Sequence, residues 1–230
     1  MIASVHVADI RRRSALGVLR KAPTAASAPG LRHANVALAA PLSPSLRKSP
    51  QLGRAALVAF WDDDASLDHF LTEHPTAHAL SEGWRVRLAP LRVHGSWPGV
   101  PDDLPHGRTV EHDGPAAVLT LGRVKLGRVV PFLRTSAKAE GAVLGAPGLI
   151  WATGLAKPPF VCTCSLWQSS DALSAYAYGD ETAAHPNAIA ANTAKGFHHQ
   201  SAFIRFRPYA SEGKLDGRNP LAEGWMTSRT

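Results

Sequence analysis

Two side chains in the second half of the chain, His185 and Arg205, are candidates for binding a cofactor or for catalysis. His185 belongs to AHPNAIAAN (184–192), where it precedes a proline well suited to the first position of a helix. The surrounding alanines leave room for a large flat group, and a neutral imidazole nitrogen is a good axial ligand for haem iron. The segment therefore predicts either an iron ligand or a helix-starting turn with no ligand role.

Arg205 lies between Ile204 and Phe206 in a segment with the composition of a strand. An unpaired guanidinium in such a place is costly. We therefore expect Arg205 to meet a carboxylate, another anion or a cofactor propionate, and we assign it a catalytic as well as a cofactor-binding role.

The segment KGFHHQ, which precedes the same strand, supplies further candidates. Neighbouring residues of a strand point to opposite faces, so only one of His198 and His199 can face a pocket. We assign Phe197 and His199 as cofactor contacts and leave the division of roles between the two histidines open.

The two cysteines, Cys162 and Cys164, are spaced C-x-C in PFVCTCSLW. Alternation places both on one face of a strand, which is neither a metal-site spacing nor a good geometry for a mutual disulfide. Two buried thiols are the simpler interpretation.

Composition predicts a globular protein. The 230 residues are 45% hydrophobic and 19% charged, and no apolar stretch reaches the roughly 18 residues of a membrane-spanning helix. The N-terminus lacks the order of a signal peptide, so we expect a cytoplasmic protein, with a peripheral place at a membrane left open. The formal charge of +7 is densest at RRR (11–13), but no zinc-finger or RNA-binding motif accompanies it, and nucleic acid is not expected as a partner.

Several common catalytic motifs are missing. The sequence has no Walker loop, no G-x-G-x-x-G after a strand, no G-x-S-x-G and no H-E-x-x-H. Nucleotide-binding, α/β-hydrolase and zinc-protease functions therefore lack support.

An internal duplication organises the chain. ALVAFWDDDASLDHFLTEHPTAHAL in the first half is similar to VCTCSLWQSSDALSAYAYGDETAAHPNAIA in the second, which carries five extra residues around YGDET. Because both halves would inherit the same turn or ion pair from a common ancestor, a histidine or arginine that recurs in both halves need not bind a ligand. The landmarks are the pairs Trp61/Trp167, His74/His185 and Arg87/Arg205, and we expect the tryptophans to be core aromatics, Arg87 to serve packing and His74 to keep only the turn.

Each half is predicted to follow the order strand, helix, strand, strand, helix, strand, which is the ferredoxin-like plan. Its helices cover only one face of the sheet, so two units packed sheet to sheet would cover each other in a pseudo-dimeric α/β barrel of the α+β class. The expected units are 1–95 and 116–221, the second with the haem site, joined by a linker at 96–115 and followed by a tail at 222–230. Strands are expected near 2–8, 33–39, 54–61, 84–94, 116–124, 148–154, 159–167 and 200–209, and helices near 11–21, 64–82, 127–144 and 169–195, the last broken at Pro186.

At KPPFVCTCSLWQSSDALSAYAYG, AHPNAIAAN and FIRFRPYASEGKLDGRNPL the chain resembles the spheroidene monooxygenase family of carotenoid biosynthesis and its actinobacterial relatives. The resemblance is strongest over 158–221 and weaker but collinear over the first half, including AFWDDDASLDHFLTEHP and GSWPG. On the family pattern the histidine that begins the penultimate helix falls on His185, and the arginine of the last strand falls on Arg205. The approach YGDETAAHP is longer than in the family, a departure that bears on the pocket and its substrate.

The resemblance implies an oxygenase with haem b that introduces oxygen into an apolar polyene, on a scaffold similar to that of the dimeric α/β-barrel haem proteins. It also implies that a partner protein donates electrons, and it leaves a homodimer open. Other functions on the same scaffold are a haem-dependent dehydratase or peroxidase and a non-catalytic haem or small-molecule carrier.

Overall fold

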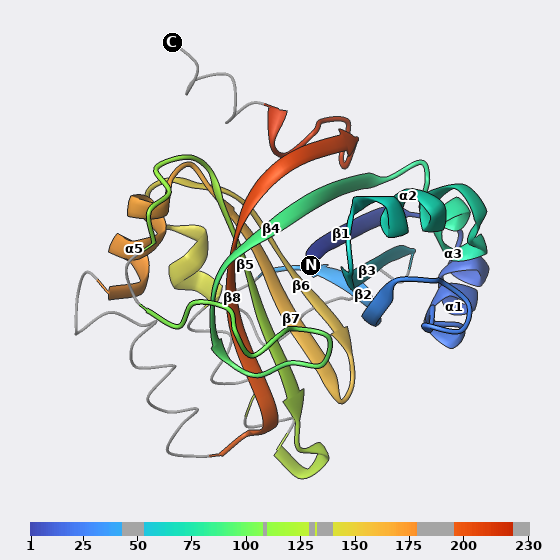
Figure 1. The fold of residues 1–230 in the computed structure, drawn as a ribbon, viewed down its shortest axis with the longest axis horizontal. Coiled ribbons are helices and arrows are strands. Elements are labelled where there is room, and N and C mark those ends of the chain that lie inside the picture. The colour runs from blue at the N-terminus through green and yellow to red at the C-terminus, as the bar shows by residue number, and fades with distance from the viewer. Residues whose placement is uncertain (43–52, 108–109, 129–131, 133–139, 179–195, 223–230) are drawn as a thin grey trace.

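Eight antiparallel strands close into one barrel in the computed structural model, which describes residues 1–42, 53–107, 110–128, 132, 140–178 and 196–222 (Figure 1). Around the barrel the strands follow the order β1-β3-β2-β6-β7-β5-β8-β4, and β4 pairs with β1 to close it. The strands are β1 (Ile2–Asp9), β2 (Leu31–Pro41), β3 (Arg54–Trp61), β4 (Trp84–Gly95), β5 (Ala116–Val124), β6 (Leu149–Lys157), β7 (Phe160–Trp167) and β8 (His198–Gly213).

The halves of the chain contribute strands in the same order. The first half gives β4-β1-β3-β2 and the second gives β8-β5-β7-β6. Antiparallel pairing of β2 with β6 and of β4 with β8 joins the halves at both edges. The expected α+β barrel is confirmed, with the addition that the two sheets are hydrogen-bonded along their edges as well as facing each other.

The barrel interior is filled with side chains. Alternation along β7 sends Phe160, Cys162, Cys164 and Leu166 inward, where they join the apolar residues of the other strands. Both cysteines are buried free thiols, as predicted, and burial raises the pKa of the Cys164 thiol to about 12. A closed and apolar interior directs the search for a site to the outside of the barrel.

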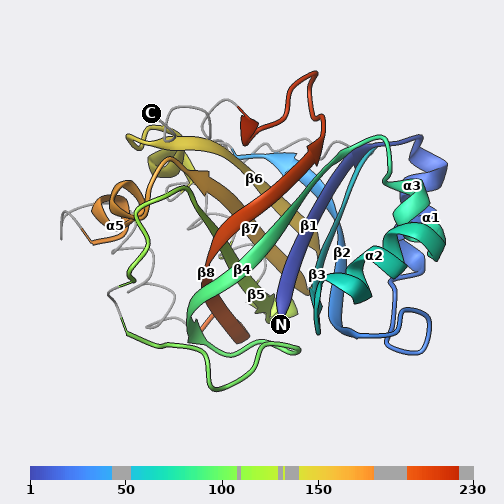
Figure 2. The same cartoon turned by 45° about the horizontal axis from the view of Figure 1, so that its top comes forward.

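In the described parts of the chain, helices lie outside the barrel in two separate places. α1 (Arg12–Arg20), α2 (Asp64–Glu73) and α3 (Pro75–Ala79) lie together against the first half, whereas α5 (Ser170–Tyr178) lies on the opposite side (Figures 1 and 2). Leu67 and Phe70 of α2 are buried against the barrel. A short turn, η1 (Leu126–Arg128), follows β5. Among the described residues, no helix is long and apolar enough to cross a bilayer.

The single helix predicted over 64–82 is wrong, because the structure has two helices there. α2 ends at Glu73, and Pro75 occupies the first turn of α3. Proline has no N–H to continue the helical hydrogen bonds, and the His74 backbone turns to an extended conformation before it. The predicted break at Pro186 lies outside the described residues, as does most of the helix predicted at 127–144.

Part of the stretch expected as a linker, 96–115, contacts the barrel. Trp97 is buried, with its ring centroid 5.9 Å from that of Phe160, and the Val93 N–H donates to the Pro105 carbonyl across 2.9 Å. β4 ends at Gly95 and β5 begins at Ala116, while the division of the chain into two units stays a prediction.

Candidate functional site

The two halves present equivalent outer faces, and the strand registers define which residues correspond. In the first half Ser4 pairs with Ala59 of β3 and Arg87 of β4. In the second half Val118 pairs with Ser165 of β7 and Arg205 of β8. Counted this way, the first outer face consists of Ser4, His6, Val36, Leu57, Ala59 and Arg87, and the second outer face consists of Val118, Thr120, Gly154, Thr163, Ser165 and Arg205.

The centre of the first outer face is filled. His6, Leu57 and Val36 lie in one row across β1, β3 and β2, and all three are buried. The His6 ring packs edge-on against Phe70 of α2, with ring centroids 6.3 Å apart. Bulky side chains and a helix therefore close this face.

The centre of the second outer face is shallow. The row equivalent to His6, Leu57 and Val36 consists of Thr120, Thr163 and Gly154. These residues are smaller, and all three are partly exposed. The difference in volume leaves a wall of small and polar groups at the place where the first half has packed side chains.

The charge of Arg87, at the edge of the first outer face, is neutralised by carboxylates of the neighbouring helix α2. Its guanidinium forms ion pairs with Asp64, at 2.6 Å between Nη1 and Oδ1, and with Asp68. Both carboxylates belong to α2, and the Tyr209 hydroxyl donates to Asp64 across 2.9 Å. Arg87 is thus held by ion pairs within the first half, and its purely structural role stays a prediction.

Arg205, at the equivalent edge of the second outer face, meets no carboxylate of the described residues. It is buried, and its Nη2 donates to the Ser174 hydroxyl of α5 across 3.3 Å. Within the described parts of the chain no acidic oxygen lies within 4.0 Å of it. Burial lowers the pKa of Arg205, and the nearby charge of Arg92 lowers it further.

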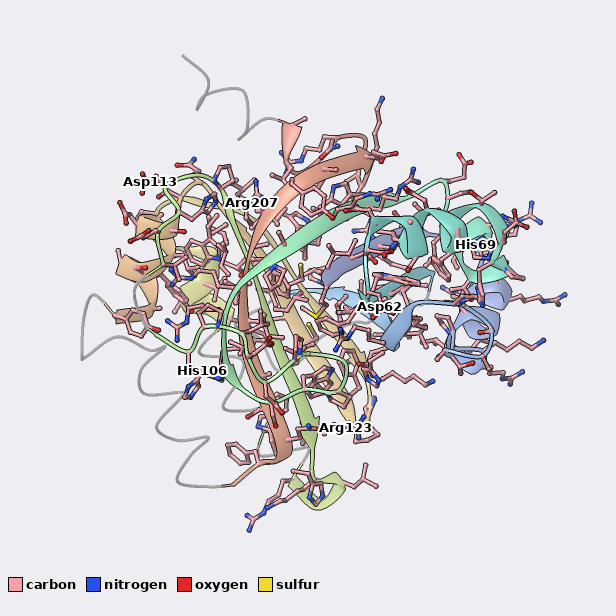
Figure 3. All side chains as sticks on the ribbon, in the orientation of Figure 1. Asp62, His69, His106, Asp113, Arg123 and Arg207 are labelled. Atoms are coloured by element: carbon pink, nitrogen blue, oxygen red, sulfur yellow. The ribbon has the colours of Figure 1, made fainter. Side chains whose placement is uncertain are left out.

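Arg92 of β4 pairs directly with Arg205 across the junction between the two halves. It is buried too, and its Nη1 donates to the Tyr178 hydroxyl of α5 across 3.3 Å. Two buried guanidinium groups, those of Arg92 and Arg205, thus lie beside α5. Arg207, the next residue on the same face of β8, is exposed (Figure 3).

The paired histidines of β8 differ in position. The His198 ring lies over Gly122, where an added Cβ would come within 2.6 Å of the imidazole, and edge-on to Phe132 with centroids 5.1 Å apart. Burial lowers the pKa of His198 and favours its neutral form. His199 is exposed, and Phe197 is buried beside Phe132. Of the two histidines, His198 is therefore the one that the strand directs to the second outer face, whereas the cofactor contact assigned to His199 stays a prediction.

His185 lies outside the described residues, but its predicted counterpart His74 is well defined. The His74 Nδ1 accepts a hydrogen bond from the Thr76 N–H across 3.1 Å, and its ring stacks on Phe70 at 4.9 Å. It caps the helix that Pro75 begins, which confirms that His74 keeps a turn. His69, by contrast, points outward from α2 on the helical side of the first half (Figure 3).

Comparison with known proteins finds relatives that match about three quarters of the chain. The chain is 31% identical to a spheroidene monooxygenase of Rubrivivax gelatinosus over 175 residues, which are 74% of this chain and 66% of that protein. It is 29% identical to a spheroidene monooxygenase of Rhodobacter capsulatus over 183 residues, 76% of this chain and 75% of that one. The chain belongs to the spheroidene monooxygenase family. It spans just under two thirds of the length of the Rubrivivax relative, and no family model matches it.

The fold also has a counterpart among solved structures. A crystal structure of aldoxime dehydratase is 12% identical and superposes with a TM-score of 0.54, over 95% of this chain and 82% of the other. At that identity the likeness concerns the fold alone.

Sequence reasoning missed three groups beside the second outer face of this spheroidene monooxygenase relative: Arg92, Ser170 and Ser174. A signal for the serines was present, because aligning Trp61 with Trp167 places Ser170 opposite Asp64 and Ser174 opposite Asp68. Arg92 had no such signal. It comes from the first half, and only the pairing of β4 with β8 brings it to the site.

Proposed function

We propose that the chain is a haem-dependent monooxygenase that oxidises an apolar small molecule, with the haem held against the second outer face beside α5. The observation that carries the proposal is the contrast at the centre of the two outer faces. A wall of Thr120, Thr163 and Gly154 is partly exposed beside the buried Arg205, which has no carboxylate partner in the described parts of the chain. The names of the curated relatives support a monooxygenase.

We also infer that the chain consists of two ferredoxin-like units, 1–95 and 116–221. Both halves have the same strand order. Both place a glycine with a positive φ directly before the second strand of the half, Gly30 before β2 and Gly148 before β6. Each glycine carbonyl accepts a hydrogen bond at the strand–helix junction, from the residue after the tryptophan, across 2.8 Å. Each tryptophan donates its indole N–H to a serine hydroxyl and lies against an aromatic ring of the following helix: Trp61 with Ser4 and Phe70, and Trp167 with Ser165 and Tyr176.

The residues present fit a haem group. A planar macrocycle needs a flat wall without bulky side chains, which the small residues of the second outer face provide. Its propionates need cationic donors, which Arg205 provides from a buried position. On the family resemblance we propose His185 as the iron ligand, and from their place at the start of β8 we propose Phe197 and His199 as further contacts. When bound, the haem would supply the activation of dioxygen, with electrons from a partner protein.

The chain's own residues would then bind and orient. Arg205 would hold an anionic group at the edge of the site. Two aromatic rings would contact an apolar substrate: that of Phe132, which lies beside His198, and that of Phe203, which pairs with Thr120 of the central row. His198, whose neutral form is favoured, could accept or donate a proton at the same face.

The proposal is tested by reconstituting the purified chain with haem, together with His185→Ala and His74→Ala. We expect a Soret band and axial nitrogen ligation in the wild type and in His74→Ala, and their loss in His185→Ala. Spheroidene or a similar polyene should then yield an oxygenated product only with dioxygen and a reductant. Absence of a Soret band in the wild type would contradict haem binding, and turnover that needs neither dioxygen nor reductant would indicate a dehydratase instead.

A further inference from the structure

The helices that follow the two tryptophans start in the same way. The Asp63 carboxylate accepts a hydrogen bond from the Ser66 N–H across 2.8 Å at the start of α2. The Ser169 hydroxyl accepts one from the Ala172 N–H across 3.0 Å at the start of α5. Since the caps lie at the same distance from Trp61 and Trp167 in the sequence, the first turns of α2 and α5 can be compared residue by residue.

The comparison shows an exchange of charge. In α2, the first residue and the residue four positions later are the two aspartates that bind Arg87. In α5 the same two positions hold Ser170 and Ser174. The arginine is kept, as Arg205, but both of its carboxylate partners have become neutral hydroxyls.

The serines are placed where a ligand could use them. Ser174 accepts from Arg205 at 3.3 Å, which is long for a hydrogen bond to a guanidinium. Ser170 is 3% exposed, and its Oγ has no hydrogen-bond partner in the described parts of the chain. A buried hydroxyl without a partner is costly and calls for an explanation such as an absent ligand.

We propose that Ser170, Ser174 and Arg205 form a carboxylate-binding site, in which a carboxylate of the ligand takes the place that the α2 aspartates occupy beside Arg87. The Ser170 and Ser174 hydroxyls and the Arg205 guanidinium donate to its oxygens, which neutralises the buried cation. This inference rests on the proposed function where the carboxylate is concerned, because a propionate of the bound haem would supply it. A free organic acid has the same chemistry.

The test installs the missing carboxylates. In Ser170→Asp/Ser174→Asp, Arg205 gains the internal partners that Arg87 has. We expect the haem-free variant to unfold about 2–4 °C higher than the wild type, while its affinity for haem falls about 10- to 100-fold. The matched control Ser170→Asn/Ser174→Asn has side chains of the same size without charge, and should not raise the unfolding temperature. The reverse exchange, Asp64→Ser/Asp68→Ser, should lower the unfolding temperature and leave haem affinity unchanged.

Esterified haem identifies the source of the carboxylate. Haem dimethyl ester lacks the propionate charge, so the wild type should bind it about 10- to 100-fold more weakly than haem, and the Asp variant should not discriminate. Equal binding of haem and its ester by the wild type, together with an acetate-induced rise in unfolding temperature that the Asp variant loses, would indicate a free acid as the ligand of the same site.

Failure of this site and failure of the proposed function give different results. A wild type without a Soret band, but stabilised by acetate, would contradict haem binding and support the carboxylate site. A wild type that binds haem and its ester equally and does not respond to acetate would overturn the site. A fall in the unfolding temperature of the haem-free Asp variant would overturn it as well.

Discussion

The two outer faces of the barrel differ in the size of the side chains in their central row and in the partners of their arginine. The first face is filled by His6, Leu57 and Val36, and its Arg87 is paired with two aspartates. The second face keeps the same backbone register with small residues, and its Arg205 meets a serine. The backbone plan is thus retained while one copy has the side chains of a packed core and the other has those of a binding surface. Such an asymmetry is what we expect if one copy holds the barrel together and the other binds a ligand.

The largest effect should come from a feature that both halves share. Gly30 and Gly148 have positive φ angles, and a Cβ would lie 2.5 Å from the Cβ of Ser66 or of Ala172. Alanine at either position should therefore cost about 2–4 kcal/mol of unfolding free energy, from backbone strain and overpacking together. Denaturant unfolding of Gly30→Ala and Gly148→Ala checks this. Tolerance at only one of the two positions would show that the strand–helix junctions are not equivalent.

The arginines should separate stability from binding. Arg87→Leu removes the partner of Asp64 and Asp68 and should lower the free energy of unfolding by about 1–3 kcal/mol, with no change in haem affinity. Arg205→Leu removes a buried cation and should reduce haem affinity about 10- to 100-fold. Haem titration and thermal unfolding of both variants give the comparison. Similar losses of stability, with unchanged haem affinity in both, would mean that both arginines are structural.

The filled centre of the first face should make stability depend on pH. Burial lowers the pKa of His6 from 6.5 to about 3, with smaller contributions from Arg85 and Arg87. Because the unfolded chain takes up the proton first, His6 contributes stability above pH 6.5 that is lost as the pH falls toward 3. Between pH 7.5 and pH 5 this loss should be about 2 kcal/mol. His6→Thr, which installs the threonine found at the equivalent position 120 of the second half, should remove that part of the pH dependence. An unchanged slope of unfolding free energy against pH would show that His6 is not buried in its neutral form.

The smallest effects concern the serines below the tryptophans. The Ser4 hydroxyl contacts both Trp61, at 2.9 Å, and His6, at 3.0 Å. Among the described residues, the Ser165 hydroxyl receives a hydrogen bond only from Trp167, at 2.9 Å. Ser165→Ala should cost about 1 kcal/mol and Ser4→Ala about 2 kcal/mol, because the second leaves two buried groups without a partner. Equal costs in chemical denaturation would weaken the comparison of the two rows.

Much of the fold could be predicted from the sequence, because its signals are local. The predicted strand ranges overlap the eight strands in the described parts of the chain, and the range 116–124 coincides with β5. The repeated tryptophans gave the correspondence between the halves. The division of the first long helix was missed, although His74-Pro75 carried the signal, because the preceding apolar pattern continues through it.

The candidate site was less accessible to sequence reasoning. Arg205 could be found from its place on an apolar strand, but Arg92 reaches it only through pairing between the halves. The choice between His198 and His199 depends on a shift in strand register between Arg123 and Val124, which no local pattern shows. A charge that is absent, as at Ser170, is visible only when the two copies are compared.

The central claim is that the second outer face is a binding surface because its central row is small. The most direct test fills that row: Thr163→Leu installs the side chain that Leu57 has in the first half, and Leu57→Thr is the matched exchange. Haem titration, followed by the Soret band, should show at least a roughly tenfold loss of affinity in Thr163→Leu, while the variant stays folded. A tenfold loss corresponds to about 1.4 kcal/mol of binding free energy. Leu57→Thr should lose stability and keep its affinity for haem. Unchanged haem affinity in Thr163→Leu would contradict the claim.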